Sequence, residues 1–112
     1  MNKKKYKIKE GDIKKILGTD MGCIASDMIT VEGMVVGYMY REEPVEEYDS
    51  GWRFFSGQED DNYVDNPDNF SFYKLNTIAN YDLLVIGYLN FPVGSSFERS
   101  READKFLKNR NL

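Results

Sequence analysis

A short alternating run that ends at Gly57 constrains the fold more than any other part of this chain. Successive side chains of a β-strand point to opposite faces, so Trp52 and Phe54 would share one face while Arg53 and Phe55 share the other. Trp52 is the only tryptophan of the chain, and large aromatic side chains bury more surface than most others. We therefore expect Trp52 and Phe54 to anchor the core, although tryptophan is also enriched at interface hot spots.

Length and composition indicate one folded domain. The chain has 112 residues, of which 41% are hydrophobic and 14% aromatic, which is enough to build a single core over 1–112. The expected strands cluster early, with short helices between them, and do not follow a regular strand–helix alternation. This order is typical of an α+β fold, here a mainly antiparallel sheet with a few short helices packed on it.

Hydrophobic periodicity and turn residues predict the individual elements. The predicted strands or extended segments are 23–29, 34–41, 52–56, 70–75 and 95–99. The first two would form a hairpin about Gly33. The predicted helices in the terminal regions are 10–17 and 102–107. Residues 1–9 would be a Lys-rich arm or an edge strand.

Polar residues mark further helix starts in the second half of the chain. Asn76 or Thr77 would N-cap a short helix, and Asp82 would cap the apolar segment 83–89. That segment is either a second short helix or a buried strand, and the Asp cap favours the helix. The predicted surface loops are 42–50 and 59–69, the second with room for one helical turn.

Charge is distributed unevenly along the chain. The net charge is −4, yet residues 41–68 hold ten acids and two arginines, a net of −8. Residues 1–15 hold seven lysines and two acids, a net of +5. The acidic centre repels phosphates, which argues against nucleic acid as a partner, and it would speed the encounter with a basic protein. The alternative is that these charges only keep the chain soluble.

Two features of the composition exclude several classes of catalyst. The chain has no histidine and one cysteine, Cys23, which rules out an internal disulfide, a thiolate–imidazole zinc site and a Ser–His or Cys–His pair. Cys23 lies in an apolar run, so we expect a small core residue. The acids within 59–68 lack the glycine and the closing glutamate of a calcium loop. We expect no metal, no cofactor and no enzymatic activity.

The sequence contains no segment that suggests a membrane protein. A spanning helix needs about 20 consecutive apolar residues, whereas the longest apolar run, 83–89, contains a glycine and a tyrosine. The N-terminal lysines are not followed by the apolar stretch of a signal peptide. We therefore expect a cytoplasmic protein.

The acidic cluster after Gly57 is the predicted partner-binding surface. Its carboxylates would attract a basic protein, and the tyrosine beside them would add an amphipathic contact. Arg53, on the strand face opposite Trp52, would either pair with a neighbouring carboxylate or contact the partner. The candidate residues are Glu59, Asp60, Asp61, Tyr63 and Arg53.

Several motifs also follow one another in a recognisable order. They are Gly51-Trp52-Arg53-Phe54-Phe55-Ser56-Gly57, Glu59-Asp60, Tyr63, Asn66-Pro67, Tyr73-Lys74-Leu75-Asn76-Thr77-Ile78, Asn80-Tyr81-Asp82 and Gly94-Ser95-Ser96-Phe97-Glu98-Arg99. Together they resemble the DUF2185 family, which is also described as the Imm33 immunity protein family. The resemblance covers about residues 23–106 and departs from the family pattern at Leu83, where the family often has proline.

The resemblance implies an α+β domain that neutralises a bacterial toxin by direct binding, without catalysis. The alternative is a stand-alone cytosolic domain that binds a small ligand or regulates a housekeeping protein. The sequence leaves a homo-oligomer open. The motif residues expected to serve the fold are Trp52, Phe54, Gly57, Asn76, Tyr81, Asp82 and Arg99.

Overall fold

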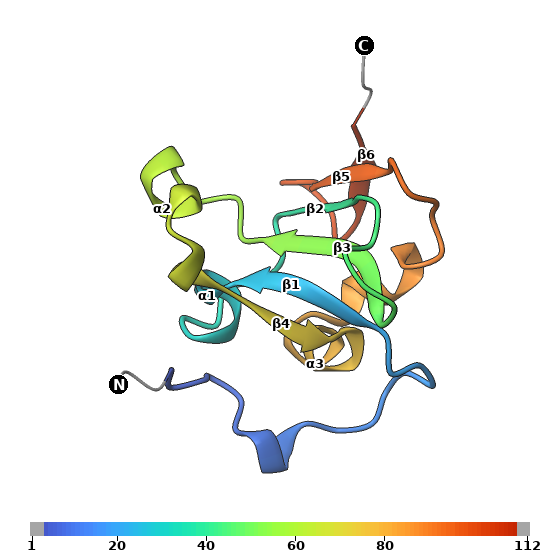
Figure 1. Cartoon of the computed structure of the whole chain (residues 1–112). Helices are drawn as coiled ribbons and strands as arrows, with labels where there is room; N and C mark the ends of the chain where they lie inside the picture. The colour runs from blue at the N-terminus through green and yellow to red at the C-terminus, as the bar shows by residue number, and fades with distance from the viewer. Residues whose placement is uncertain (1–3, 110–112) are drawn as a thin grey trace.

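The computed structural model describes residues 4–109, and its centre is a six-stranded sheet (Figure 1). The strand order is β4-β1-β3-β2-β5-β6. β1 and β3 are parallel, and every other neighbouring pair is antiparallel. The predicted α+β fold with a mainly antiparallel sheet is confirmed. The strands are β1 (Gly22–Ser26), β2 (Tyr38–Arg41), β3 (Asp49–Phe55), β4 (Phe70–Lys74), β5 (Ser96–Arg99) and β6 (Phe106–Lys108).

Short helices connect these strands. The α-helices are α1 (Asp27–Thr30), α2 (Asp61–Asp65) and α3 (Leu75–Tyr81). The 3-10 helices are η1 (Glu10–Asp12), η2 (Pro67–Asn69) and η3 (Leu83–Tyr88). Asp82 accepts the N–H of Leu84 at 3.1 Å and caps η3, so the expected Asp cap is confirmed and the segment after it is helical. The polar stretch predicted as a loop contains α2 and η2.

The predicted hairpin about Gly33 is wrong. The first strand ends at Ser26, because its Oγ accepts the N–H of Met28 at 3.1 Å and caps α1. The chain then crosses to the far side of β3, where β2 begins at Tyr38 and pairs with β3 and β5. Gly37 lies at this crossing, and a Cβ there would stand 2.0 Å from the carbonyl oxygen of Ser56. Only glycine allows so close an approach of the two backbones.

The predicted helix over 10–17 is also wrong beyond its first turn, η1. Side chains of α3 bind the backbone of this segment and hold it extended. Asn76 Oδ1 accepts the N–H groups of Ile16 and Leu17 at 2.7 and 2.8 Å, and its Nδ2 donates to the Lys14 carbonyl at 2.9 Å. Asn76 therefore does not cap α3, which begins at Leu75 without a side-chain cap.

The predicted helix over 102–107 is replaced by a bend and by β6. Strand pairing with β5 satisfies the backbone of this segment, with Phe106 opposite Arg99. The N–H of Phe106 donates to the Tyr88 hydroxyl at 3.0 Å, and the two rings meet edge to face with centroids 5.1 Å apart. The apolar residues at helical spacing therefore reflect one buried strand residue, Phe106, and an exposed neighbour, Leu107.

The core lies between one face of the sheet and the helices α1, α3 and η3. Trp52 is fully buried at its centre, stacks on Phe54, and donates its indole N–H to the Leu89 carbonyl at 3.1 Å. Cys23 is fully buried too, as expected, and burial raises the pKa of its thiol. The buried cluster consists of Cys23, Ala25, Ile29, Val36, Met39, Trp52, Phe54, Leu75, Ile78, Val85, Phe97 and Phe106.

Truncation of the central aromatic residue should destabilise the domain strongly. We expect Trp52→Ala to lower the free energy of unfolding by about 3–5 kcal/mol, because it opens a cavity and leaves the Leu89 carbonyl without its donor. Phe72→Ala, at a position 49% exposed, is the matched control and should cost at most about 1 kcal/mol. Urea unfolding followed by circular dichroism measures both, and equal losses would contradict this description of the core.

Candidate functional site

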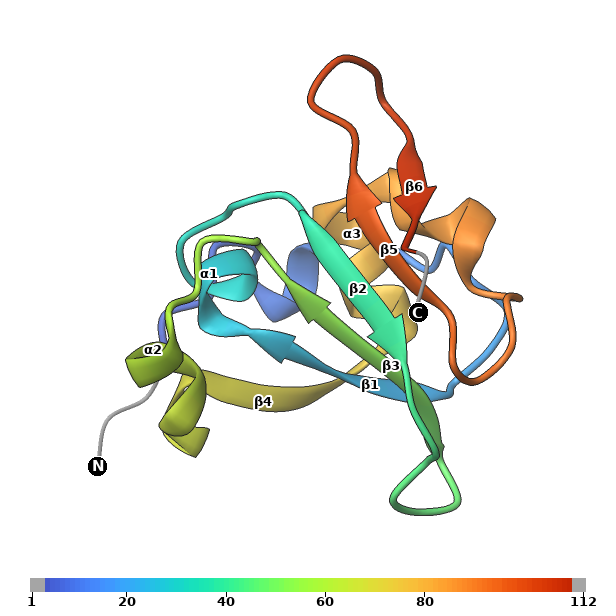
Figure 2. The same cartoon turned by 90° about the horizontal axis from the view of Figure 1, so that it is seen from above.

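The face of the sheet opposite the core is open. In Figure 2, α1, α3 and the N-terminal segment lie behind the sheet and leave β2 and β3 uncovered toward the viewer. Strand register determines which side chains project from this open face, because Met39 and Phe54 are paired core residues and their neighbours must point the other way. The open face comprises Ile24, Tyr38, Tyr40, Arg53, Phe55, Phe70, Phe72, Ser96 and Glu98.

Five aromatic side chains form a continuous row on and beside the open face. The row consists of Tyr40, Tyr38, Phe55, Phe70 and Tyr63, which come from β2, β3, β4 and α2. Phe55 is central: it stacks on Tyr40 with centroids 5.9 Å apart and meets Phe70 edge to face at 5.6 Å. Tyr63 extends the row by meeting Phe70 at 5.9 Å. Each ring remains partly exposed, and contiguous exposed aromatic surface is a mark of interaction sites.

Carboxylates surround this aromatic row. Glu42 follows β2, Glu98 stands on β5 opposite Tyr38, and Glu59 lies beyond the end of β3. Asp61 is exposed in the first turn of α2, the helix that carries Tyr63. We call this set the acidic rim, and it consists of Glu42, Glu59, Asp60, Asp61 and Glu98. An apolar centre with a charged border is the usual anatomy of a protein-binding surface.

Arg53 is buried on the open face, where two carboxylates bind its guanidinium. Its Nη1 and Nη2 donate to Asp49 at 3.0 and 2.8 Å, and its Nε donates to Glu42 at 2.6 Å. The side chain of Arg53 is 4% exposed and that of Asp49 is fully buried, whereas Glu42 is 47% exposed. Of the two roles considered for Arg53, the structure shows pairing with neighbouring carboxylates.

Asp49 fixes the loop before β3 as well as the arginine. Hydrogen bonds from Arg53 lower the pKa of Asp49 to about 2, against the opposing effect of burial and with help from the backbone N–H groups of Val45 and Gly51. Both N–H groups lie 2.9 Å from its carboxylate oxygens. The ionised form of Asp49 is therefore part of the folded state.

Two acids of the predicted partner-binding cluster hold local structure. Glu59 accepts the N–H groups of Ser56 and Gly57 at 2.8 and 2.9 Å, around a turn in which Gly57 has φ +94°. Burial alone would raise the pKa of Glu59, but the hydrogen bonds it accepts outweigh burial and lower that pKa. Asp60 caps α2 by accepting the N–H of Tyr63 at 2.8 Å. Both carboxylates fix the place of the acidic rim, whereas Asp61 is exposed and makes no ion pair within residues 4–109.

The other motif residues lie on the covered side and join separate segments. Asp82 accepts the N–H of Val36 at 3.0 Å and Nη1 of Arg99 at 2.6 Å. The Tyr81 hydroxyl accepts the N–H of Ile8 at 3.0 Å and donates to the Thr30 carbonyl at 2.9 Å. These contacts bind the N-terminal segment, the crossing before β2 and the end of β5 to the core.

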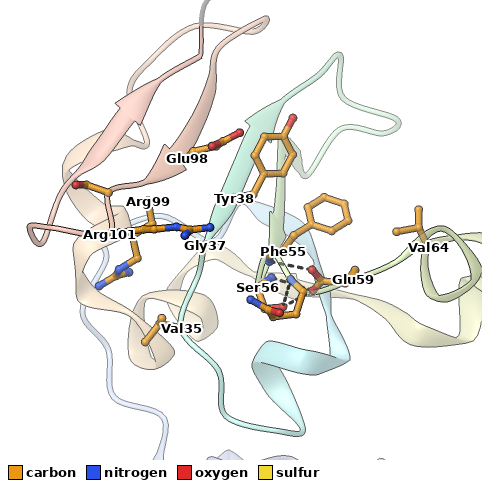
Figure 3. A pocket seen from close by; sticks show the side chains of 13 residues that line it. Val35, Gly37, Tyr38, Phe55, Ser56, Glu59, Val64, Glu98, Arg99 and Arg101 are labelled. Atoms are coloured by element: carbon orange, nitrogen blue, oxygen red, sulfur yellow. Dashed lines mark hydrogen bonds between the residues drawn. The ribbon is translucent and has the colours of Figure 1, made fainter.

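A pocket of about 680 Å³ opens beside the aromatic row (Figure 3). Tyr38 and Phe55 form one wall, and the connection after β5 forms the other. Glu98 and Glu59 also line it. Its size falls within the range of small-ligand and peptide sites, about 300–1,000 Å³.

Sequence reasoning named Glu59, Asp60, Asp61, Tyr63 and Arg53 as candidate contacts and did not bring the aromatic row together. The alternation in 34–41 put Tyr38 and Tyr40 on one face, and the alternation in 52–56 put Phe55 opposite Trp52. The sequence did not show that these two strands are neighbours, nor that β4 brings Phe70 beside them. The missing information was the order of strands in the sheet.

Residues 4–109 hold no group of three or more potential metal-binding side chains. Within the same range, no helix is long and apolar enough to cross a bilayer.

Comparison with known proteins decides the family. The model of the immunity protein Imm33 domain matches residues 23–110. The chain belongs to this family. The matched range contains the whole open face and both walls of the pocket. Neither a curated protein nor a solved structure matches the chain. Membership of an Imm33 immunity family supports an immunity role, implies a protein partner of the toxin type, and suggests a role other than catalysis.

Stability of this Imm33 domain should fall in acid because of Asp49. Its pKa is about 2 in the folded state and near 4 in an unfolded chain. The corresponding stability is fully present above about pH 4 and is lost as the pH falls toward 2, a loss of about 2 kcal/mol. Asp49→Asn should remove this part of the pH dependence, and Asp65→Asn, an exposed acid, should retain it. Urea unfolding between pH 6 and pH 2 measures the difference, and identical acid profiles for wild type and Asp49→Asn would refute the assignment.

Proposed function

We propose that this chain neutralises a bacterial toxin by covering it with the open face of the sheet, without turnover. The observation that carries the proposal is the one-sided packing of the sheet. Helices cover one face, whereas the other presents a row of partly exposed aromatic rings inside an acidic rim. Antiparallel sheets usually alternate apolar and polar residues when one face meets water. Exposed aromatic rings on the open face are better explained as a surface that binds a partner.

The chemistry of the face indicates a basic partner. Acids outnumber arginines by eight in residues 41–68, and the rim places several of them around the rings. Complementary charge would speed the encounter, and the aromatic row would then slow dissociation. A toxin nuclease, whose groove is basic because it holds phosphates, fits this description. The binding would take place in the cytoplasm of the bacterium that makes both proteins.

Occlusion accounts for neutralisation without chemistry by this chain. The sequence has no histidine, and the carboxylates of Glu59 and Asp49 are engaged in hydrogen bonds with the protein's own backbone and Arg53. Family membership supports the same conclusion, because it suggests a role other than catalysis. The first experiment is to coexpress the chain with a toxin encoded beside its gene, and to measure growth rescue and direct binding.

Reversal of rim charges should slow association. Glu59 and Asp60 hold local structure, so the test uses the exposed residues Asp61 and Glu98 instead. We expect the double variant Asp61→Lys, Glu98→Lys to lower the association rate constant about tenfold at low salt and less at high salt. Glu10→Lys with Asp12→Lys, on η1 behind the sheet, carries the same charge change and should leave the rate nearly unchanged. Stopped-flow fluorescence measures both, and equal rates for the two variants would remove the open face as the binding surface.

Truncation in the aromatic row should speed dissociation. Tyr40→Ala and Phe55→Ala each remove a ring from the row, and hot-spot residues of this kind contribute about 2 kcal/mol or more to binding. We therefore expect each variant to dissociate roughly 30-fold faster or more. Tyr6→Ala, at an aromatic residue 42% exposed behind the sheet, is the control. Biolayer interferometry measures the rates, and unchanged dissociation of the row variants would contradict the proposal.

A further inference from the structure

We propose that the pocket beside the aromatic row receives an arginine side chain of the partner, stacked on Tyr38 and paired with Glu98. This inference rests on the proposed function, since it names the anchor by which a basic toxin is held. It assigns a specific role to a pocket that the aromatic row and the acidic rim share.

The pocket has room for a long side chain together with its backbone. It lies between the ends of β2 and β3 and the connection that follows β5, and its volume is about 680 Å³. Two aromatic residues, Tyr38 and Phe55, form a wall that continues into the aromatic row. A segment of the partner lying across the row could therefore place one side chain in the pocket without leaving the open face.

Glu98 supplies the carboxylate that would meet the incoming charge. It stands directly opposite Tyr38 in the β2–β5 register, so both side chains project from the open face. In Figure 3 the carboxylate of Glu98 lies beside the Tyr38 ring. Glu98 is exposed, and in the described range it makes no ion pair. Glu59, which also lines the pocket beyond Phe55, is held by the turn at Gly57 and adds a second negative charge.

The two arginines of the pocket do not cancel this charge at the aromatic wall. Arg99 is neutralised from behind by Asp82, at 2.6 Å, and also donates to the Val36 carbonyl at 3.2 Å. Arg101 is exposed, and in Figure 3 its guanidinium points away from Tyr38 and Phe55. The wall between Tyr38 and Glu98 therefore combines an aromatic face with an unpaired carboxylate.

This combination favours arginine over other side chains. A guanidinium is planar, so it can stack on a tyrosine ring while its edge donates two hydrogen bonds to one carboxylate. A lysine ammonium would keep the charge and the attraction to the ring but lose the paired hydrogen bonds. A neutral side chain of the same length would lose both electrostatic terms.

A capped tripeptide, Gly-Arg-Gly, tests the pocket without the toxin. Added to the ¹⁵N-labelled full chain, it should shift the amide signals of Gly37, Gly57 and Glu98, with a dissociation constant in the millimolar range expected for so small a ligand. The same peptide with citrulline in place of arginine should bind at least fivefold more weakly. Citrulline keeps the shape of arginine and lacks its charge.

Two charge variants decide whether the pocket prefers a positively or a negatively charged ligand. Glu98→Gln should weaken binding of the arginine tripeptide at least threefold, and Arg101→Gln should strengthen it, because removing a positive charge makes the pocket more negative. Glu10→Gln, behind the sheet, should bind as the wild type does. The opposite order, with Glu98→Gln stronger and Arg101→Gln weaker, would overturn the inference in favour of an anionic ligand.

The outcomes separate this inference from the proposed function. The arginine pocket would be overturned if the arginine tripeptide shifts no amide signal, or if the citrulline peptide binds equally well, and if Glu98→Gln also leaves the toxin affinity unchanged. Toxin binding by the open face would then remain intact. Arginine-specific shifts at Gly37 and Glu98 would support the pocket even if the toxin does not bind. In that case only the proposed function fails.

Discussion

The structure depends on the packing of Trp52 and Phe54 against helices that cover one face of the sheet only. The indole of Trp52 is fully buried and hydrogen-bonded to the Leu89 carbonyl at the end of η3. Inverting β3 would therefore expose Trp52 and Phe54 to solvent. Alternation along β3 then fixes what the other face shows. Phe55 must point outward, and its contacts with Tyr38, Tyr40 and Phe70 make the aromatic row. The core and the candidate binding surface are two sides of the same strand.

Arg53 holds the loop before β3 in place through a buried charge. Asp49 accepts four hydrogen bonds from Arg53, Val45 and Gly51, which binds the acidic loop after β2 to the middle strand. Removing Arg53 would leave the charge of Asp49 buried and unpaired, a loss of about 3–5 kcal/mol in comparable pairs. Glu42 completes the pair from the solvent side and belongs to the acidic rim. The position of part of the rim is therefore set by an interaction inside the protein.

Local patterns in the sequence predicted local structure well and long-range pairing poorly. The core role of Trp52, the Asp82 cap and the strands near 70–74 and 96–99 follow from residue types over a few positions. The hairpin about Gly33 failed because Ser26 caps a helix, and the helix over 10–17 failed because Asn76, some sixty residues away, binds its backbone. The contact from Asn76 leaves no signal in the segment that it changes, whereas Ser26 lies inside the predicted strand and is itself a typical N-cap residue. Local patterns do not reveal the aromatic row either, because its rings come from four elements that only the order of strands brings together.

The account as a whole claims that a toxin partner covers the open face, and hydroxyl-radical footprinting measures this directly. Aromatic side chains oxidise readily, and this chain carries exposed or partly exposed rings on both sides of the sheet. The account predicts that the bound toxin protects Tyr38, Tyr40 and Phe55 from oxidation and leaves Tyr6 and Phe91 as reactive as in the free chain. Protection of Tyr6 and Phe91, with the open face still fully reactive, would contradict it.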